Sequence, residues 1–339
     1  MTKRRQAGAL QKVSATSSQL LVCAVDLGGT NLRAATIGSD GEIYDRVKCS
    51  TPRTNDANEI VQSITAAVKE CDKAAAARGQ RVAALCIVVP GSVHAQTGLV
   101  VNAPNVPAIV DFPLTDALES SLGTPILIEN DANAAAVGEM WRGAGRGLKT
   151  IVCFTLGTGV GSGVVLNGEL LRGIDGTAGE IGHTSVNPFG GVKCKCGNTG
   201  CLEVYASATA IVRMARELLP DHPQSTLQTI DAADLSAREV ARAAREQDPC
   251  ALATFEKMAV HLGVGMANVV NALNPEAIVI GGGVSAAFDL FATRARGEML
   301  KRAFPVPAER CQIVKAECGD DAGLLGAAWL AHSHNKLSV

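Results

Sequence analysis

The hydrophobic pattern of the first part of the chain predicts a strand-rich unit that carries two helices. Residues 20–49 read as an apolar strand, a Gly-Gly turn, a second strand, a polar Ser-Asp-Gly-Glu turn and a third strand. Residues 58–78 predict an Ala-rich helix, and residues 81–91 predict a buried strand that ends at a Pro-Gly pair. Residues 124–141 then predict a strand, a polar tip and a second helix.

The second half repeats this plan in its pattern, although not in residue identity. Residues 149–173 again predict a strand, a glycine turn, a second strand, a turn and a third strand. Helices are expected to dominate from residue 206 to about 274, and a buried strand meets a glycine turn at residues 276–285. A short edge strand at 311–318 and a closing helix at 321–334 complete the pattern.

These patterns predict an α/β protein with two lobes, and they divide the chain into four segments. The expected segments are a disordered tail at 1–19, a smaller lobe at 20–133, a larger lobe at 134–317, and a closing segment at 318–339 whose helix packs back on the first lobe.

Composition narrows the classes of partner. The 339 residues carry a net charge of −2 and only 3% aromatic residues, so we expect no surface for binding nucleic acid. No apolar run reaches membrane-spanning length, and the basic first 19 residues lack the apolar core of a secretory signal. The eleven scattered cysteines fit a reducing cytoplasm, where clustered cysteines more often bind metal than form disulfides.

Two glycine turns, DLGGTN at 26–31 and LGTGVGSG at 156–163, each lie between two predicted strands. A dinucleotide fingerprint needs a helix after its glycines, and a P-loop needs a Gly-Lys-Ser/Thr ending. The backbone N–H groups of a glycine hairpin can still form an anion nest. Asp26 would repel phosphate there unless a cation such as water-bound Mg²⁺ lay between them.

One such turn alone could equally be a plain tight hairpin. Because two occur at equivalent places in the two lobes, together they predict a nucleotide cleft. A third turn, VIGGGVS at 279–285, could pass close to an adenosine, although a glycine-rich strand end is also common.

Glu129, Asn130 and Asp131 stand where a buried strand gives way to an Ala-rich helix. Asp131 could be the N-cap of that helix, which is the more common role for such a residue. Alternatively, it could be a general base aimed into a cleft. Phosphoryl transfer to an alcohol needs a carboxylate that orients the hydroxyl and accepts its proton.

Cys194, Cys196 and Cys201 fall within eight residues, which a hydrophobic core does not require. Structural zinc is usually four-coordinate with cysteine and histidine ligands, and His183 lies eleven residues upstream. We therefore predict a structural zinc held by three cysteines and His183, rather than three free thiols.

Two glutamates flank this predicted metal site. Glu180 stands three residues before His183, and Glu203 stands two residues after Cys201. A metal that holds both segments also holds both carboxylates in place, as recognition of sugar hydroxyls requires. Simple surface solvation is the alternative, but the residues around both acids are apolar.

From about residue 20 to about residue 331, the chain resembles the ROK family (repressors, open reading frames and kinases). The motifs that carry the resemblance occur in the family's order: DLGGTNLR, VPG, NAPNV, ENDANAAAVGE, LGTGVGSGVV, GEIGH, CKCGNTGCLE and VIGGGV. The resemblance implies a two-lobed actin/hexokinase-like ATPase fold of duplicated RNase H-like lobes. It further implies a kinase that uses ATP and Mg²⁺ to phosphorylate a hexose, with glucose the first candidate.

The resemblance also implies roles for single residues. Asp131 would be the catalytic base on the sugar 6-hydroxyl, and His183 would serve both zinc and sugar. The sugar-binding residues would be Gly91, Asn105, Asn130, Asp131, Glu180, His183 and Glu203. The residues at ATP and its Mg²⁺ would be Asp26, Gly28, Gly29, Thr30, Asn31, Thr158, Gly159, Gly282 and Gly283. A homodimer is the family expectation.

The family also contains repressors, whose core follows a helix-turn-helix domain. Only about two dozen residues precede Asp26 here, too few for the three helices of that domain, so we expect a kinase. A sugar sensor without catalysis is a third interpretation, against which the intact Asp131 argues. Mannose, fructose or an N-acetylhexosamine could replace glucose, and polyphosphate could replace ATP.

Overall fold

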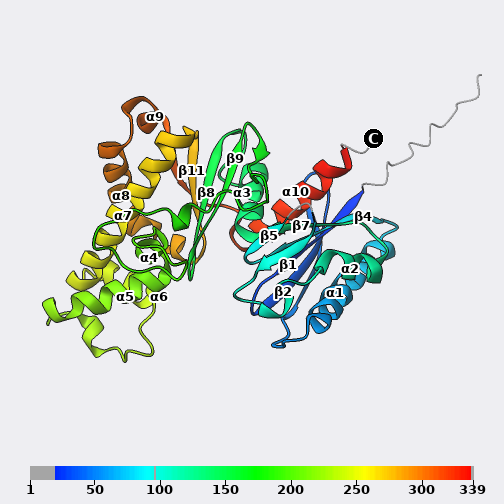
Figure 1. Ribbon diagram of the computed structural model, residues 1–339, viewed down its shortest axis with the longest axis horizontal. Coiled ribbons are helices and arrows are strands. Elements are labelled where there is room, and N and C mark those ends of the chain that lie inside the picture. The colour runs from blue at the N-terminus through cyan, green and yellow to red at the C-terminus, as the bar shows by residue number, and fades with distance from the viewer. Residues whose placement is uncertain (1–19, 95–96, 337–339) are drawn as a thin grey trace, which may run out of the picture.

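The computed structural model describes residues 20–94 and 97–336 and shows two β-sheets of the same topology side by side (Figure 1). The predicted tail at 1–19 lies outside the described residues. In each sheet an antiparallel meander of three strands is followed by two strands parallel to its first strand. The sheet orders are β3-β2-β1-β4-β7 and β10-β9-β8-β11-β12.

The strands of the first sheet are β1 (Leu21–Leu27), β2 (Asn31–Ile37), β3 (Ile43–Ser50), β4 (Val82–Val89) and β7 (Ile126–Asn130). Those of the second sheet are β8 (Ile151–Leu156), β9 (Val160–Leu166), β10 (Glu169–Leu170), β11 (Ala277–Gly281) and β12 (Gln312–Lys315). A separate hairpin pairs β5 (Ser92–His94) with β6 (Leu99–Asn102).

Helices cover both sheets, and each lobe has its own set of helices on the outer face of its sheet. The α-helices are α1 (Ala57–Ala77), α2 (Leu114–Leu122), α3 (Asp131–Arg142), α4 (Glu203–Ala206), α5 (Ala208–Leu218), α6 (Ala237–Arg245), α7 (Pro249–Leu273), α8 (Phe288–Arg302), α9 (Pro305–Arg310) and α10 (Ala322–Lys336). Short 3₁₀ turns are η1 (Pro107–Ile109), η2 (Ile181–His183), η3 (Leu219–Asp221), η4 (Thr226–Thr229), η5 (Gly283–Ala287) and η6 (Gly319–Asp321). Helices α1 and α2 pack on the first lobe, whereas α5 to α8 build the core of the second.

Two helices, α3 and α10, lie between the sheets and cross each other (Figure 1). Helix α3 follows a strand of the first sheet but packs on β8 and β9 of the second, while α10 follows the second sheet and packs on β1 and β4 of the first. The crossing is close because it is made at glycines. A Cβ on Gly326 would lie 1.8 Å from the backbone oxygen of Ala134, and one on Gly138 would lie 2.2 Å from that of Ala322.

A third hydrophobic cluster joins the lobes at this crossing. It contains Val22 from β1, Val137 from α3, Cys153 from β8 and Leu324 from α10, all nearly inaccessible to solvent. The two lobes are therefore connected by a shared core, and the carboxyl ends of β4, β7, β8 and β11 open onto the space between them.

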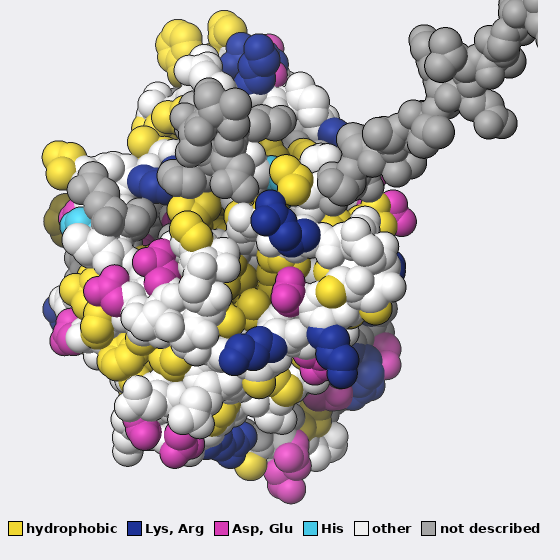
Figure 2. Space-filling model, turned by 90° about the vertical axis from the view of Figure 1, so that its right-hand side faces the viewer, with side chains coloured by type: hydrophobic (Ala, Val, Ile, Leu, Met, Phe, Trp, Pro, Cys, Tyr) yellow, Lys and Arg dark blue, Asp and Glu magenta, His cyan; other side chains and the backbone are white. Residues whose placement is uncertain are grey.

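The surface gives two further observations. Figure 2 views the end of the molecule formed by the first lobe, and on its described part acidic and basic side chains are interspersed without a continuous basic patch. None of the helices in the described residues is long and apolar enough to cross a membrane.

Candidate active site

A cleft with a cavity volume of about 630 Å³ lies between the lobes. Both lobes contribute to its wall, and the wall includes every residue that sequence analysis assigned to a sugar. These are Gly91, Asn105, Asn130, Asp131, Glu180, His183 and Glu203. Three residues assigned to the nucleotide, Thr158, Gly159 and Gly282, line the same cavity. Segments more than a hundred residues apart in sequence thus meet in one polar cavity.

Asp131 is the first residue of α3 and is not its cap. The cap is Asn130, whose side-chain oxygen accepts a hydrogen bond from the Asn133 N–H at 3.0 Å. The Asn130 amide nitrogen also donates to the Gly91 oxygen at 2.7 Å and to Asp131 Oδ1 at 3.1 Å. The capping interpretation of Asp131 therefore does not describe this helix, and its carboxylate faces the cleft.

The surroundings of Asp131 change its acidity. The residue is exposed to the open cleft, but protein atoms surround it on its other sides. This desolvation raises the pKa of Asp131 to about 6, partly offset by a hydrogen bond from the Ala132 N–H and reinforced by the nearby charge of Asp26. A carboxylate of this pKa is mostly ionised at neutral pH, yet is more basic than an ordinary aspartate.

Gly91 can occupy its place only because it lacks a side chain. Its φ is +113°, and a Cβ there would lie 2.0 Å from the Asn102 oxygen. The Pro90-Gly91 pair at the end of β4 therefore approaches the hairpin β5–β6 closely, and it brings the Gly91 carbonyl to Asn130.

The two glycine turns occupy different positions. In the second lobe, the Gly157 N–H donates to the Gly159 oxygen at 2.9 Å, and Thr158 and Gly159 line the cleft. In the first lobe, the Gly28 N–H donates to the Asn31 oxygen at 2.9 Å, but this turn is not part of the main cavity wall. Gly29 instead lines an adjoining cavity of about 370 Å³ that shares Asn105 with the cleft.

Asp26, at the end of β1, forms an ion pair with Arg33 of β2. Burial raises the pKa of Asp26, and the Arg33 charge opposes this shift. Another guanidinium nitrogen of Arg33 donates to the backbone carbonyl oxygen of Asp320 at 2.8 Å, in the segment that leads into α10. The cation beside Asp26 in this structure is therefore an arginine of its own sheet.

A second cavity of about 390 Å³ adjoins the cleft through Gly157 and Thr158. Gly283 lies in its wall, next to the apolar side chains of Ile211, Phe255 and Val284. Arg238 and Arg245 also line the wall, and Arg245 forms an ion pair with Asp289 at 2.8 Å, so the cavity suits a flat heteroaromatic ring beside the charge of Arg238. Sequence analysis missed most of these residues, because they come from several helices that no local motif connects.

The predicted metal ligands come together. The ligand atoms of His183, Cys194, Cys196 and Cys201 all lie within 4.8 Å of one another. His183 Nδ1 is 3.8 Å from Cys194 Sγ, and Cys196 Sγ is 3.7 Å from Cys201 Sγ. Three thiols and one imidazole in this arrangement form a donor set that fits tetrahedral zinc.

The geometry of His183 gives its two ring nitrogens different neighbours. Nδ1 faces the thiols, whereas Nε2 lies 3.9 Å from Glu180 Oε2 at the cleft. A metal bound at Nδ1 would leave Nε2 as the nitrogen facing the cleft.

Glu203 connects the loop of residues 194–201, here called the cysteine loop, to the second glycine turn. It begins the short helix α4, its Oε2 accepts from the Val160 N–H at 3.0 Å, and its Oε1 is 3.8 Å from Cys194 Sγ. A Cβ on Gly159 would lie 2.4 Å from Glu203 Oε2, so a side chain at this position would displace the Glu203 carboxylate.

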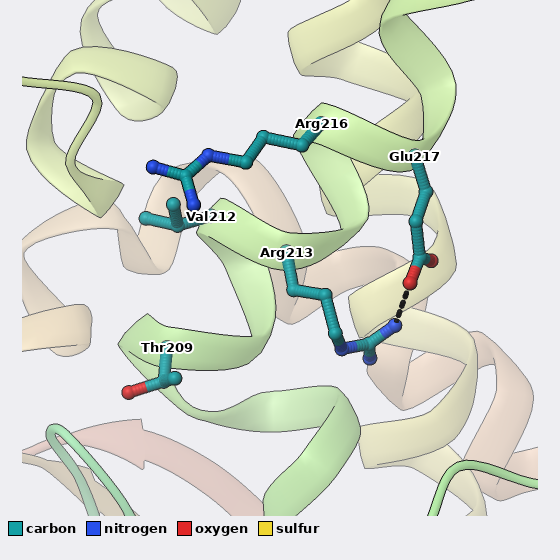
Figure 3. A pocket seen from close by; sticks show the side chains of 5 residues that line it. All are labelled: Thr209, Val212, Arg213, Arg216 and Glu217. Carbon is teal, nitrogen blue, oxygen red and sulfur yellow. Dashed lines mark hydrogen bonds and ion pairs between the residues drawn. The ribbon is translucent and has the colours of Figure 1, made fainter. Parts of the chain in front are cut away.

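Helix α5 contacts both the second glycine turn and α4, and Figure 3 shows five of its side chains. The Ala208 N–H donates to the Gly157 oxygen at 2.8 Å, and the Thr209 hydroxyl donates to the Thr158 oxygen at 2.8 Å. Arg213 donates to the Val204 oxygen at 2.6 Å and pairs with Glu217 at 2.5 Å. The open hollow of Figure 3 thus lies on the outer side of a helix that supports both the glycine turn and α4.

Further polar residues in and behind the cleft wall have no role assigned from the sequence. Ser92, Asn102, Ser162 and Thr177 line it, and Glu129 lies buried behind Asn130. The sequence contains one signal for Glu129, because it is an acid at the end of an otherwise apolar strand, ILIEN. Asn102 and Ser162 lie within the motifs NAPNV and LGTGVGSGVV, whereas Ser92 and Thr177 carry no comparable signal.

The comparisons with known proteins agree with this geometry. The model of the ROK family matches residues 22–334. The chain is 41% identical to a glucokinase of Halalkalibacterium halodurans, over 90% of this chain and 93% of the relative. It is 29% identical to a xylose repressor of Caldicellulosiruptor bescii, over 90% of this chain and 76% of the relative. It also matches the structure of a ROK family glucokinase from Streptomyces griseus in complex with glucose and AMPPNP, with 36% identity, a TM-score of 0.76, and coverage of 92% of this chain and 99% of that one.

Proposed function

The chain belongs to the ROK family, and we propose that it is an ATP-dependent hexokinase that phosphorylates glucose at the 6-hydroxyl. The observation that carries this proposal is the position of Asp131. It faces a cleft lined by polar side chains that can bind hydroxyl groups and by the second glycine turn. Sugar and phosphate would therefore meet beside a carboxylate of raised pKa.

The sugar would bind between the lobes. The carboxylates of Glu180 and Glu203 can accept hydrogen bonds from hydroxyl groups, and Asn130 can both donate and accept. His183 Nε2 would contact a further hydroxyl, and Gly91 and Asn105 would shape the wall on the first lobe. The cleft is polar enough to exchange the hydration of a sugar for protein hydrogen bonds.

ATP would bind from the second lobe. Its phosphates would lie along Thr158 and Gly159, with Gly28, Gly29, Thr30 and Asn31 approaching from the other lobe. The adenosine would occupy the cavity beside Gly282 and Gly283. The apolar wall of that cavity suits the ring, and Arg238 adds positive charge, whereas Arg245 is already paired with Asp289.

Asp26 would hold Mg²⁺ through water, in exchange for part of its contact with Arg33. When bound, Mg²⁺ neutralises the charge of the phosphates during transfer. The fit rests on the chemistry of this end of β1, where the Asp26 carboxylate stands directly before a glycine turn.

Asp131 would act as the general base. Its carboxylate orients the 6-hydroxyl and accepts the proton as the oxygen bonds to the terminal phosphorus. The bond between that phosphorus and the bridging oxygen breaks, and ADP leaves. Because the pKa of Asp131 is about 6, the base is ionised at neutral pH.

A zinc ion bound by His183, Cys194, Cys196 and Cys201 would have a structural role. It would hold the cysteine loop and the 3₁₀ turn η2 together, and thereby fix Glu180 and Glu203. Elemental analysis of the purified protein should find about one zinc per chain, the stoichiometry of a four-coordinate site of this kind. Active protein without zinc would contradict this role.

A hexose panel tests the proposed function. Initial rates with glucose, mannose, fructose, N-acetylglucosamine and N-acetylmannosamine would be measured with ATP, and separately with polyphosphate. We expect the highest kcat/KM with glucose and ATP. A higher value for another sugar would assign the chain to that kinase instead, and sugar binding without phosphoryl transfer would indicate a sensor.

The repressor alternative has its own measurement. We propose that the chain binds no operator DNA, in line with the mixed charge on the described part of the face in Figure 2. Specific binding of a DNA fragment at nanomolar protein and physiological salt would overturn this part of the proposal. The expected homodimer is tested by sedimentation velocity.

A further inference from the structure

An ion pair between a buried carboxylate and a half-exposed guanidinium connects the lobes next to the cleft. Glu129 is the penultimate residue of β7 in the first sheet, and Arg172 follows β10 at the edge of the second sheet. Arg172 Nε is 2.8 Å from Glu129 Oε2. The Glu129 side chain is 4% exposed, whereas that of Arg172 is 38% exposed.

The remaining contacts of Glu129 are with the segment that carries the catalytic base. Its Oε1 accepts from the Asn130 N–H at 3.0 Å and from the Asn133 side-chain amide at 3.0 Å. Asn130 and Asn133 are the cap of α3 and the residue that it caps. The Glu129 carboxylate therefore holds the first turn of α3, on which Asp131 stands.

Arg172 stands at the start of the loop that carries the opposite half of the site. Its backbone oxygen accepts from the Ala178 N–H at 3.0 Å, and the loop continues through Thr177 and Glu180 in the cleft wall. At its far end the loop is held by Ser162 of β9, whose hydroxyl donates to the Gly179 oxygen and accepts from the Ile181 N–H. Arg172 is thus the point at which this loop is fastened to the other lobe.

On the basis of the proposed function, we infer that Glu129 and Arg172 are positioning residues that set the distance between the catalytic base and the hydroxyl-binding loop. Neither residue lines the cavity, so neither needs to touch the sugar. Their bond instead ties Asp131, two residues from Glu129, to Glu180 and Thr177 across the lobe boundary. A sugar must contact both sides at once, so its affinity depends on this spacing.

The chemical groups of Glu129 and Arg172 fix their relative orientation as well as attracting each other. A carboxylate with so little exposure needs all of its hydrogen bonds, because an uncompensated buried charge is costly. The planar guanidinium approaches with a fixed orientation, which a flexible lysine ammonium does not reproduce. Neither residue belongs to the hydrophobic clusters of the two lobes, so loss of the bond would release the loop without removing core contacts.

The test compares Glu129→Gln and Arg172→Gln with a matched control. Glu298 of α8 is a carboxylate of similar burial, at 6% exposure, that pairs with Arg294 and Arg302 of the same helix. Glu298→Gln removes the same charge from the same kind of environment, but within one lobe and outside the cleft wall. Kinetics with glucose and ATP, glucose titration calorimetry without ATP, and thermal melting would be measured for each protein.

We expect Glu129→Gln and Arg172→Gln each to raise the KM for glucose and the calorimetric Kd for glucose by about tenfold or more, which is the scale for misplaced binding groups. The KM for ATP should change less than about twofold. Arg172→Lys should recover only part of the loss. The double variant Glu129→Gln/Arg172→Gln should be no worse than the poorer single variant, because both act through one bond. Glu298→Gln should lower the melting temperature without changing the glucose parameters.

Several outcomes would overturn the inference. Unchanged glucose parameters in Arg172→Gln would do so even if Glu129→Gln failed to fold, because Arg172 is half-exposed on a loop. Equal rises in the KM for glucose and for ATP would indicate a general structural role instead. Additive effects in the double variant would also reject a shared bond. Failure of the proposed function would look different, because the unmodified protein itself would not phosphorylate glucose.

Discussion

Asp131 and Glu203 are two carboxylates that face one cleft, but different kinds of structure hold them in place. Asp131 begins a regular helix of twelve residues and depends on a cap and two hydrogen bonds within its own segment. Glu203 begins a helix of only four residues, directly after three cysteines that fit a metal. It also reaches across to the Val160 N–H in another segment.

This difference predicts different roles for the same chemical group. A base must keep one orientation and a suitable pKa, which a strand end and a helix start provide through the backbone itself. A hydroxyl-binding group needs position more than basicity, so its place can depend on a loop that a metal orders. The contrast between the two carboxylates can be tested by breaking each support in turn.

The largest expected effect is on catalysis at Asp131. Asp131→Asn keeps the size of the side chain but removes its basic site, so kcat should fall by at least ~10²-fold, the usual scale of general-base catalysis. Glu203→Gln should instead raise the KM for glucose and leave kcat within about tenfold, because it removes binding rather than the base. Steady-state kinetics with glucose and ATP measure both.

That comparison fails if Asp131→Asn keeps more than about a tenth of the original kcat, far above the general-base expectation. In that case Asp131 would be a structural residue at the start of α3, and the base would have to be sought at Glu180 or Glu203.

The next largest effect is expected at Glu203, whose position depends on the predicted zinc site. Cys196→Ser should lose zinc and weaken glucose binding on the order of 10-fold to 100-fold, the range that loss of outer-shell support usually produces. The cause is release of Glu203 and Glu180, while the strand end that carries Asp131 is untouched. Elemental analysis and glucose titration calorimetry measure the two changes together.

Cys311→Ser is the control, since Cys311 is a buried cysteine directly before the edge strand β12 and outside the metal cluster. Zinc loss without weaker glucose binding in Cys196→Ser would separate the metal from the sugar site and contradict its proposed role.

A smaller effect is expected on the pH profile. The pKa of Asp131 is raised to about 6, and a general base works only when ionised. The value of kcat/KM should therefore be level above about pH 7 and fall roughly tenfold per pH unit below about pH 6. Glu203→Gln should keep the same acid limb at a lower overall level. If Glu203→Gln shifts the acid limb, the titrating group is Glu203 and not Asp131.

The smallest expected effect is on stability. A folded-state pKa above the ordinary value means that the charged form of Asp131 disfavours folding at neutral pH. This cost begins as the pH rises through about 4 and is complete above about 6. Because Asp131 is exposed to the cleft, water screens much of it. Asp131→Asn should therefore raise the melting temperature by only about 1–3 °C at pH 8 and by nothing below about pH 4.

Differential scanning calorimetry at both pH values measures this difference. A lower melting temperature for Asp131→Asn at pH 8 would show that the carboxylate contributes more to the start of α3 than its desolvation costs.

Much of the fold follows from local pattern. The expected helix at 58–78 is α1 at Ala57–Ala77, and the closing helix at 321–334 is α10 at Ala322–Lys336. Both strand–turn–strand units occur as expected, because apolar alternation and glycine turns act over only a few residues. Helix α2 and the hairpin β5–β6 were not predicted, because these short elements are stabilised mainly by tertiary contacts.

The candidate site divides in the same way. Cys194, Cys196 and Cys201 are close in sequence, so their spacing alone predicts that they bind the same metal ion. The role of Asn130 as the cap in place of Asp131 could not be read from the sequence, because either residue type can cap a helix. The side chains around Gly283 and the bond between Glu129 and Arg172 join segments that are far apart along the chain.

The sequence by itself thus specified the repeated strand plan, the glycine turns and the ligand-rich loop, since each depends on neighbours a few positions away. The crossing of α3 and α10, the closeness of the two lobes and the distance from Asp131 to Glu180 depend on packing. A glycine such as Gly326 reads only as a flexible residue until a backbone oxygen lies where its Cβ would be. Long-range contacts of this kind are selected by the fit of whole surfaces, and no single segment contains that information.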